Sequence, residues 1–267
     1  MLQLSIMTMF MMKSFRQHFV YRSNTVILAL GSFLQLFVLI SVWRGLFAGQ
    51  ESIRGVTYDD MILFVLVNML VGTLTHSRIA ATIGDKVMTG SISTDLIRPV
   101  SFKTYILADQ WGENLFRLLF SAIPACVVYF AFMSVPSVAA DPLRILLFFI
   151  SAAGGIAIIY HIHYLLGLTS FWTGNAYYVE WFMRAFFELF AGTFVPLWFY
   201  PQWLLSIGHY LPFRLVTFEP IAILAGRTDI RGAVGILLLQ GLWIAILLLI
   251  ENRVWKMAQN KVFIQGG

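Results

Sequence analysis

The sequence predicts an all-α, polytopic membrane protein, and three features support that fold class. The chain has 267 residues, 24 of them Phe, only 12% charged residues and a mean hydropathy of +0.80, which is more apolar surface than a soluble core of this length can hide. Several apolar runs reach the roughly 18 to 20 residues that a helix needs to cross about 30 Å of hydrocarbon. No alternating ten-residue pattern recurs, which argues against a β-barrel. We therefore predict a single transmembrane domain, residues 1–267.

The first predicted element is an interfacial helix at residues 1–22, where Met and Phe stand beside Lys13, Arg16 and Arg22. A disordered tail is the alternative. Six transmembrane helices follow, at residues 25–46, 60–83, 112–133, 143–170, 177–197 and 232–250. The first of them is too long for a signal peptide and is not followed by a small-residue cleavage site, so we expect it to be a retained anchor.

The distribution of basic residues predicts the orientation. With the amino terminus in the cytoplasm, eleven Lys and Arg residues lie on the cytoplasmic side and six on the other, so both termini are predicted to be cytoplasmic. The net charge of +5 arises at the ends of apolar segments, where lipid head groups account for it, and no nucleic-acid partner is expected. Cys126, the only cysteine, lies inside an apolar run, which excludes a disulfide within the chain.

The longest non-spanning segment on the predicted cytoplasmic side is residues 84–111, which contains the polar stretch KVMTGSISTDLIRPVS. Ile92 and Leu96 recur at helical spacing beside polar residues, which indicates a short amphipathic helix ended by Pro99. Ser101 is placed to cap a new helix toward the third span. A short helix with only a packing role is the alternative to a functional loop.

On the other side, the longest non-spanning segment is residues 198–231. Prolines punctuate it and its flank at intervals, and Trp and Tyr residues between them suit the membrane–water interface. This composition predicts short helices in place of one continuous span.

These two segments resemble parts of type-2 ABC transporter permeases. GSISTDLIRPVSFKTYILAD, residues 90–109, resembles the cytoplasmic loop by which such permeases contact their ATPase. FVPLWFYPQWLLSIGHYLPFRLVTFEPIAILAG, residues 194–226, resembles the family's re-entrant segment before the last span, which caps the exit route. The resemblance implies an ATPase-coupling loop that includes Lys86, Gly90, Leu96, Arg98, Pro99 and Ser101. It also implies an exit cap that includes Pro196, Pro201, His209, Pro212 and Arg214. Lys86 stands where many relatives carry acidic residues, so its charge pairing with an ATPase is expected to differ.

Charged residues inside the predicted fifth span form a second candidate site. Glu180, Arg184 and Glu188 are spaced i, i+4 and i+8 and therefore share one helix face. They suit either a substrate or coupling site facing a cavity, or a structural ion pair that fixes helix packing. By contrast, His161 and His163 are two residues apart and point about 200° apart on a helix, so they are not expected to share a metal ion.

The sequence contains no Gly-Lys dipeptide and hence no Walker A motif. We therefore expect no cofactor in this chain and place ATP and Mg²⁺ on a partner. The resemblance implies half of the transmembrane part of an ABC exporter in a bacterial inner membrane, which moves an amphiphilic or hydrophobic substrate. Its expected partners are cytoplasmic ABC ATPase subunits, a second permease, identical or related, and membrane lipids.

Two other classes of protein remain as alternatives. In a secondary, proton-coupled transporter, Glu180, Arg184, Glu188 and His161 would form a proton relay. In a membrane-embedded lipid-modifying enzyme, His161 would act with a carboxylate. No motif for such an enzyme stands out, and six spans without internal symmetry fit a secondary transporter poorly.

Overall fold

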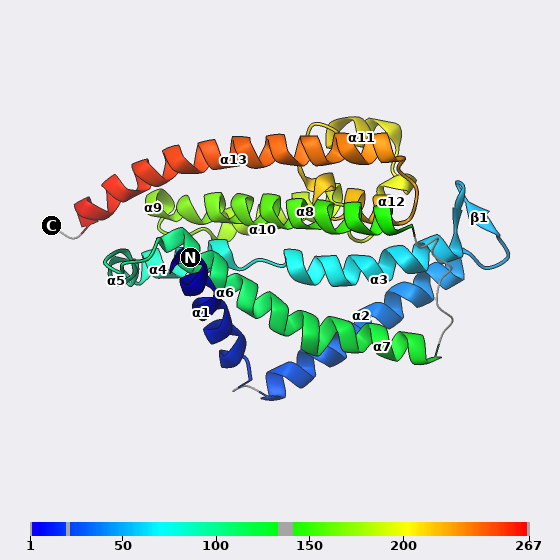
Figure 1. The fold of residues 1–267 in the computed structure, drawn as a ribbon, viewed down its shortest axis with the longest axis horizontal. Coiled ribbons are helices and arrows are strands. Elements are labelled where there is room, and N and C mark those ends of the chain that lie inside the picture. The colour runs from blue at the N-terminus through cyan, green and yellow to red at the C-terminus, as the bar shows by residue number, and fades with distance from the viewer. Residues whose placement is uncertain (1, 20–21, 133–140, 266–267) are drawn as a thin grey trace.

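Long helices run roughly along the longest axis of the molecule and pack against one another (Figure 1). The computed structural model describes residues 2–19, 22–132 and 141–265. The long helices are α2 (Arg22–Leu46), α3 (Tyr58–Thr75), α8 (Pro142–Leu168), α13 (Ile230–Gln265) and one continuous rod formed by α6 (Phe102–Arg117), the π-helical η1 (Leu118–Ala122) and α7 (Ile123–Phe132). The all-α prediction is confirmed apart from one very small hairpin, β1 (Ser52–Ile53) and β2 (Val56–Thr57).

Five of the six predicted spans coincide with helical segments that are long and apolar enough to cross a membrane. Within the described residues these are Asn24–Leu46, Tyr58–Met88, Phe102–Ala131, Pro142–Thr173 and Ile230–Lys261. The fifth predicted span corresponds to α10 (Tyr177–Phe190). Its 14 residues extend about 21 Å, which is less than the hydrocarbon thickness. A crossing at residues 177–197 therefore stays a prediction, and the helix there is shorter than expected.

Two predicted boundaries differ from the structure because helices continue through polar sequence. Residues 84–111 are not a loop: they hold the end of α4 (Ile79–Met88), the short α5 (Ile92–Leu96) and the start of α6. The last helix continues to Gln265, well beyond the predicted end at residue 250. Polar residues of good helix propensity extend a helix past the membrane boundary, so hydropathy alone places these ends too early.

The amino-terminal helix α1 (Leu2–Gln17) is docked on α6. A Cβ at Gly112 would lie 2.3 Å from the Met11 carbonyl oxygen, so glycine is what allows the two helices to touch. The Ser14 hydroxyl donates to the Asp109 carbonyl oxygen at 2.8 Å. A helix at this position was predicted, and its attachment to α6 makes it part of the folded domain.

Helix α8 forms the centre of the largest hydrophobic cluster, and small residues let its neighbours approach. At Gly155 a Cβ would lie 2.5 Å from the Val216 carbonyl oxygen, and at Gly167 one would lie 2.7 Å from the Ile83 side chain. The run Ser151 to Gly155 and Gly167 therefore serve packing within the chain. His161 and His163 point to different neighbours, as their spacing predicts.

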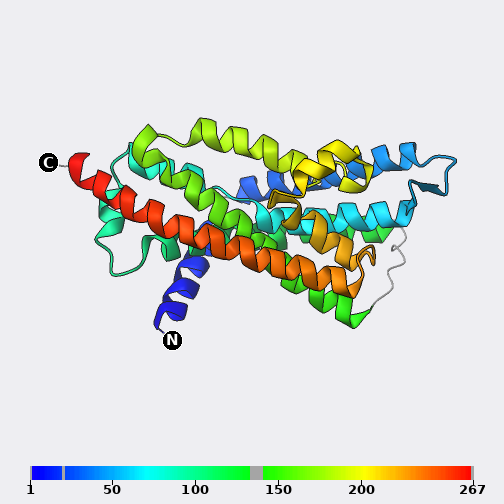
Figure 2. The ribbon, with the colours of Figure 1, turned by 90° about the horizontal axis from the view of Figure 1, so that it is seen from above.

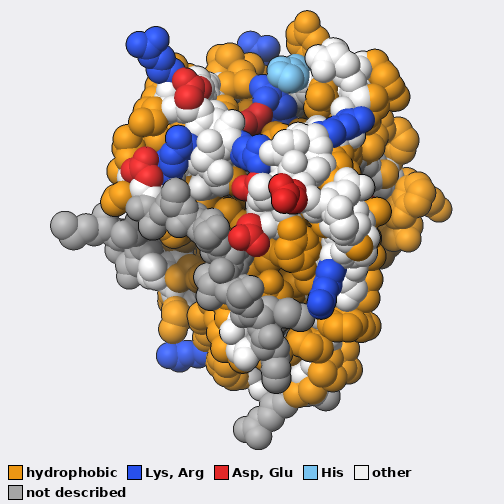
Figure 3. Space-filling model, turned by 90° about the vertical axis from the view of Figure 1, so that its right-hand side faces the viewer, with side chains coloured by type: hydrophobic (Ala, Val, Ile, Leu, Met, Phe, Trp, Pro, Cys, Tyr) orange, Lys and Arg blue, Asp and Glu red, His pale blue; other side chains and the backbone are white. Residues whose placement is uncertain are grey.

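The two ends of the helical body differ in content. The α5 end holds α4, α5, α9 (Ser170–Thr173) and the carboxyl-terminal part of α13, while the hairpin end holds β1, β2 and short helices (Figures 1 and 2). These short helices are η2 (Leu197–Phe199), α11 (Gln202–Gly208), η3 (Phe213–Leu215) and α12 (Phe218–Leu224). Viewed from the hairpin end, charged side chains gather near the middle and hydrophobic ones surround them (Figure 3). This arrangement is typical of a body with apolar flanks and a polar end.

Candidate functional site

A cluster of charges organises the polar stretch at the α5 end. The side chain of Asp95 is only 3% exposed and lies 2.5 Å from the Lys86 ammonium group and 3.2 Å from the Arg98 guanidinium group. Both cations also lie over the ring of Tyr105, at 5.3 and 5.2 Å from its centre. The two basic residues of the predicted coupling loop are therefore paired within the chain, and Asp95, which the sequence did not single out, joins them.

The backbone of this segment follows its sequence closely. Gly90 has a φ of +71°, a conformation that glycine adopts without strain, and it separates α4 from α5. The short α5 ends before Pro99, and the Ser101 hydroxyl accepts from the Thr104 backbone amide at 3.4 Å as the cap of α6. The predicted short helix and the cap at Ser101 are confirmed, although the helix ends at Leu96 and does not reach Pro99.

The apolar side chains of the segment point in two directions. Ile92 is buried and Leu96 packs against the main hydrophobic cluster, while Ile97 is 83% exposed and Met88 is also exposed. Met88 is the last residue of α4 and Ile97 directly follows α5, so both exposed side chains lie at helix ends, while Ile92 and Leu96 of α5 face the core. The surface available to a partner at this end therefore includes Ile97 and Met88, and Leu96 contacts the chain's own core.

A buried carboxylate joins the start of α6 to two other helices. Glu251 on α13 is 3% exposed and forms an ion pair with Lys103 on α6. Its other oxygen lies 2.7 Å from His161 Nδ1 on α8. Beside it the rings of Phe102 and Trp255 stack with their centres 5.6 Å apart. Glu251 thus connects α6, α8 and α13 directly after the polar stretch.

The charged face of α10 is divided between two environments. Glu180 is buried, whereas Arg184 and Glu188 line a cavity of about 680 Å³ between α2, α3, α8 and α10. Within the described chain, no ion pair joins any two of the three residues, so the structure does not show the structural ion pair that the sequence analysis considered. The cavity has a mixed lining, with hydroxyls, amides and imidazoles beside aliphatic side chains.

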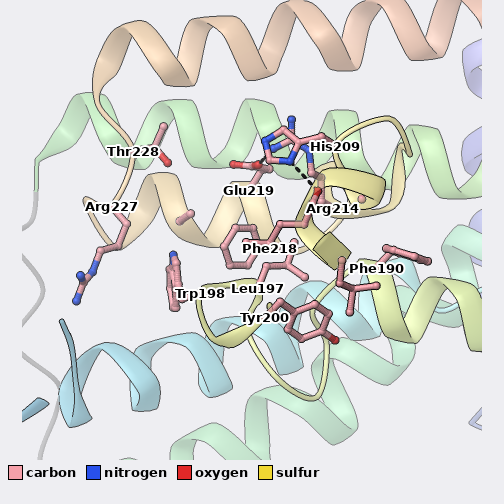
Figure 4. Close-up of a pocket in the computed structure, with 14 residues that line it drawn as sticks. Phe190, Leu197, Trp198, Tyr200, His209, Arg214, Phe218, Glu219, Arg227 and Thr228 are labelled. Atoms are coloured by element: carbon pink, nitrogen blue, oxygen red, sulfur yellow. Dashed lines mark hydrogen bonds and ion pairs between the residues drawn. The ribbon is translucent and has the colours of Figure 1, made fainter. Parts of the chain in front are cut away.

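A second cavity lies among the short helices near the hairpin end and has a volume of about 310 Å³. His209, Arg214 and Glu219 are grouped on one side of it, and aromatic side chains face them from the other (Figure 4). Arg214 and Glu219 form an ion pair, and burial raises the pKa of the Glu219 carboxyl although Arg214 beside it acts to lower that pKa. The cavity thus combines an aromatic wall with a paired guanidinium group.

The predicted exit-cap residues occupy this region in different ways. Arg214 and His209 line the cavity, while Pro196, Pro201 and Pro212 immediately precede η2, α11 and η3 respectively. Proline before or at the first turn of a helix is well tolerated, because no intrahelical bond is lost there. These prolines therefore mark the points where the short helices begin. Of the predicted exit-cap residues, only Arg214 and His209 line the cavity. Glu219, their partner, was not predicted.

A family model described as an ABC-2 family transporter protein matches residues 26–266. No curated protein and no solved structure gives a significant match.

Proposed function

Because the chain belongs to the ABC-2 family of transporter proteins, we propose that it is the membrane-spanning permease of an ATP-driven exporter. The family match over nearly the whole chain carries this proposal. The chain has no Walker A lysine to hold phosphates, so ATP hydrolysis is assigned to separate ABC ATPase subunits. A second permease, identical or related, completes the pathway by two-fold pairing.

The proposed orientation places the α5 end in the cytoplasm of a bacterial cell. The excess of basic residues near this side favours it, and α4, α5 and the carboxyl-terminal part of α13 all lie at this one end (Figure 1). Residues 134–142, proposed to face outward, fall largely outside the described residues. The hairpin and the short helices then face outward with the cavity around Arg214.

The α5 end would act as a rigid lever under the ATPase. Lys86 and Arg98 each form an ion pair with Asp95, which limits the freedom of the polar stretch. Ile97 projects from it into solvent, as expected of a contact with a partner. Because α6 begins immediately after this stretch and continues as a membrane helix, a push on α5 moves a transmembrane segment as well.

The cargo proposed is an amphiphilic or hydrophobic molecule. The cavity near the hairpin end offers an aromatic wall for an apolar part and Arg214 with His209 for a polar head. On this basis, amphiphiles should stimulate the ATPase of the reconstituted complex. Stimulation by an anionic amphiphile should fall in the Arg214→Gln/Glu219→Gln double variant, which removes both charges of the pair. Stimulation only by a small hydrophilic solute would contradict this choice of cargo.

The central experiment is co-purification of the chain with its ATPase in mild detergent, followed by ATP-dependent transport in vesicles. Ile97→Asp should release the ATPase without changing the unfolding temperature, because Ile97 is exposed. Leu96→Asp should release it and also lower the unfolding temperature, because Leu96 packs in the core and an unpaired charge there costs several kcal/mol. If the Ile97→Asp complex stays intact and transports normally, the α5 end is not the ATPase contact.

A proton-coupled transporter is the first alternative, and the observation that favours it is that Arg184 and Glu188 line the cavity without forming an ion pair within the described residues. Vesicles containing the chain alone separate the two functions. Uptake driven by a pH gradient without ATPase would support the alternative, and transport that requires ATPase and ATP would exclude it.

A further inference from the structure

The cavity between α2, α3, α8 and α10 has features of a ligand site. Its volume of about 680 Å³ lies in the range of small-molecule pockets. It is formed mainly by helices that are long and apolar enough to cross a membrane. A cavity that only filled a packing defect in such a body would be lined by apolar side chains. This one is not.

Three residues that line the cavity carry buried polar atoms without a hydrogen-bond partner in the described chain. These atoms are Asn68 Oδ1, His76 Nε2 and His163 Nδ1. Each unsatisfied buried group carries a desolvation cost, and a ring N–H of His76 or His163 can offset that cost by donating to an anionic group, whereas the Asn68 amide oxygen can only accept. Asn68 lies on α3 and His76 is the residue directly after this helix, about two helical turns further along, or about 12 Å, so polar residues follow the length of the cavity.

The charges of the lining favour an anion. Arg117 and Arg184 both line the cavity, and the only carboxylate among the lining residues is Glu188. Arg117 is already held by Glu113, which accepts from its Nε at 3.0 Å and from a terminal nitrogen at 2.7 Å. Arg184 forms no ion pair with any described residue. It is therefore the cation available to an occupant, and Glu188, one turn further along α10, would oppose an anion.

The rest of the lining suits a hydrocarbon chain. Leu36, Leu39 and Val65 line the cavity from α2 and α3, and Phe187 and Phe194 line it from α10 and the residues after it. An occupant with an anionic head and an apolar tail would satisfy both kinds of wall at once. A fully hydrophilic ion would leave the apolar wall without a partner.

We infer that this cavity binds the anionic head group of an amphiphile, a phosphate ester or a carboxylate, with Arg184 as its charge partner. His163 and His76 supply ring N–H donors to the head group. The identification of this amphiphile as the transported molecule rests on the proposed function. The binding itself does not, because it requires only this chain.

Saturable binding to the full chain in phosphatidylcholine nanodiscs, without ATPase or ATP, tests this inference. The probes are radiolabelled dodecyl phosphate and dodecanoate, with dodecyltrimethylammonium as the cationic counterpart. Arg184→Gln should weaken binding of the anionic probes about 10- to 100-fold, the range expected for a charge-assisted hydrogen bond. Glu188→Gln should tighten it severalfold and weaken the cationic probe. The stronger of the two anionic probes identifies the head group.

Matched variants keep the result interpretable. Arg253→Gln removes an exposed charge from α13 and should leave binding unchanged. Arg184→Lys retains the charge and should bind within a few-fold of the wild type, whereas a merely structural role of Arg184 would show as lowered unfolding temperature in both Arg184 variants. Absence of saturable binding, an unchanged Arg184→Gln variant, or weaker anion binding in Glu188→Gln would each overturn the inference. None of these results bears on ATP-driven transport, which the co-purification experiment tests separately.

Discussion

The ion pair between Lys86 and Asp95 can be measured by a double-mutant cycle, and the expected energies follow from its burial. Asp95→Leu leaves the Lys86 ammonium, on a side chain that is 20% exposed, without its partner. Because a long lysine side chain reaches water, we expect a loss of about 2 to 3 kcal/mol in unfolding free energy, below the ~3 to 5 kcal/mol of a fully buried broken pair. Lys86→Met should cost about 1 to 2 kcal/mol, since Arg98 still contacts Asp95.

The double variant Lys86→Met/Asp95→Leu should lie close to the wild type, because replacing both members of a buried pair by apolar groups is often nearly neutral. The coupling energy would then be about 3 to 5 kcal/mol, the sum of the two single losses, which the double variant does not show. Arg98→Met is the matched control: its side chain is 44% exposed, and exposed pairs contribute less than about 1 kcal/mol.

The assay is reversible unfolding of the purified chain in mixed micelles. If the losses of unfolding free energy in the two single variants simply add in the double variant, the pair of Asp95 and Lys86 does not fix the polar stretch. The same conclusion follows if Arg98→Met is as unstable as Asp95→Leu. Retention of the ATPase by the double variant but not by the single ones would connect the same pair to partner binding.

Three further predictions concern packing, topology and coupling. Gly155→Ala should destabilise the chain by about 1 to 3 kcal/mol, because the new Cβ meets the Val216 carbonyl oxygen. Gly235→Ala, on an open helix surface, should stabilise it by about 0.5 to 1 kcal/mol in the same thermal unfolding assay. A reporter fused after Asn260 should show cytoplasmic activity and one within residues 134–142 external activity, and the reverse pattern would contradict the orientation. Glu251→Gln should lower transport per ATP hydrolysed, because α6 loses its charged contact with α13, and an unchanged ratio would limit Glu251 to a structural role.

The positions of the long helices could be predicted because the length of an apolar run is a direct consequence of bilayer thickness. One local backbone signal could be predicted equally well: the hydroxyl of Ser101 caps the start of α6. The end of α5 was predicted less well, because the helix stops at Leu96, before the position that Pro99 restricts. The length of α10 could not be predicted, because the apolar sequence continues past Phe190 although the helix ends there. The chain turns after Phe190, and Gly192 adopts a φ of +69° in this turn.

The polar contacts were harder to predict because they join residues far apart in the chain. Lys103 and Glu251 are separated by 148 residues, and nothing in the local sequence around either one indicates the other. Asp95 reads as a solvent-facing residue of a polar stretch, yet it is almost fully buried by its neighbours. The spacing of Glu180, Arg184 and Glu188 correctly places them on one helix, but which of them reaches a cavity depends on α2, α3 and α8.

One continuous helix links the α5 end to the cavity between α2, α3, α8 and α10. Lys103, near the start of α6, contacts Glu251, and Arg117, at the end of the same helix, lines the cavity, about 21 Å away along the axis. The π-helical turn that follows presents Ser121 to the cavity and to α2, where its hydroxyl donates to the Leu28 carbonyl oxygen at 3.0 Å. Such turns are frequent at functional sites because they locally relax helix geometry. A displacement of α6 at the α5 end would therefore move the cavity wall by a similar distance. The wall lies next to the π-helical turn, where the helix deforms most easily.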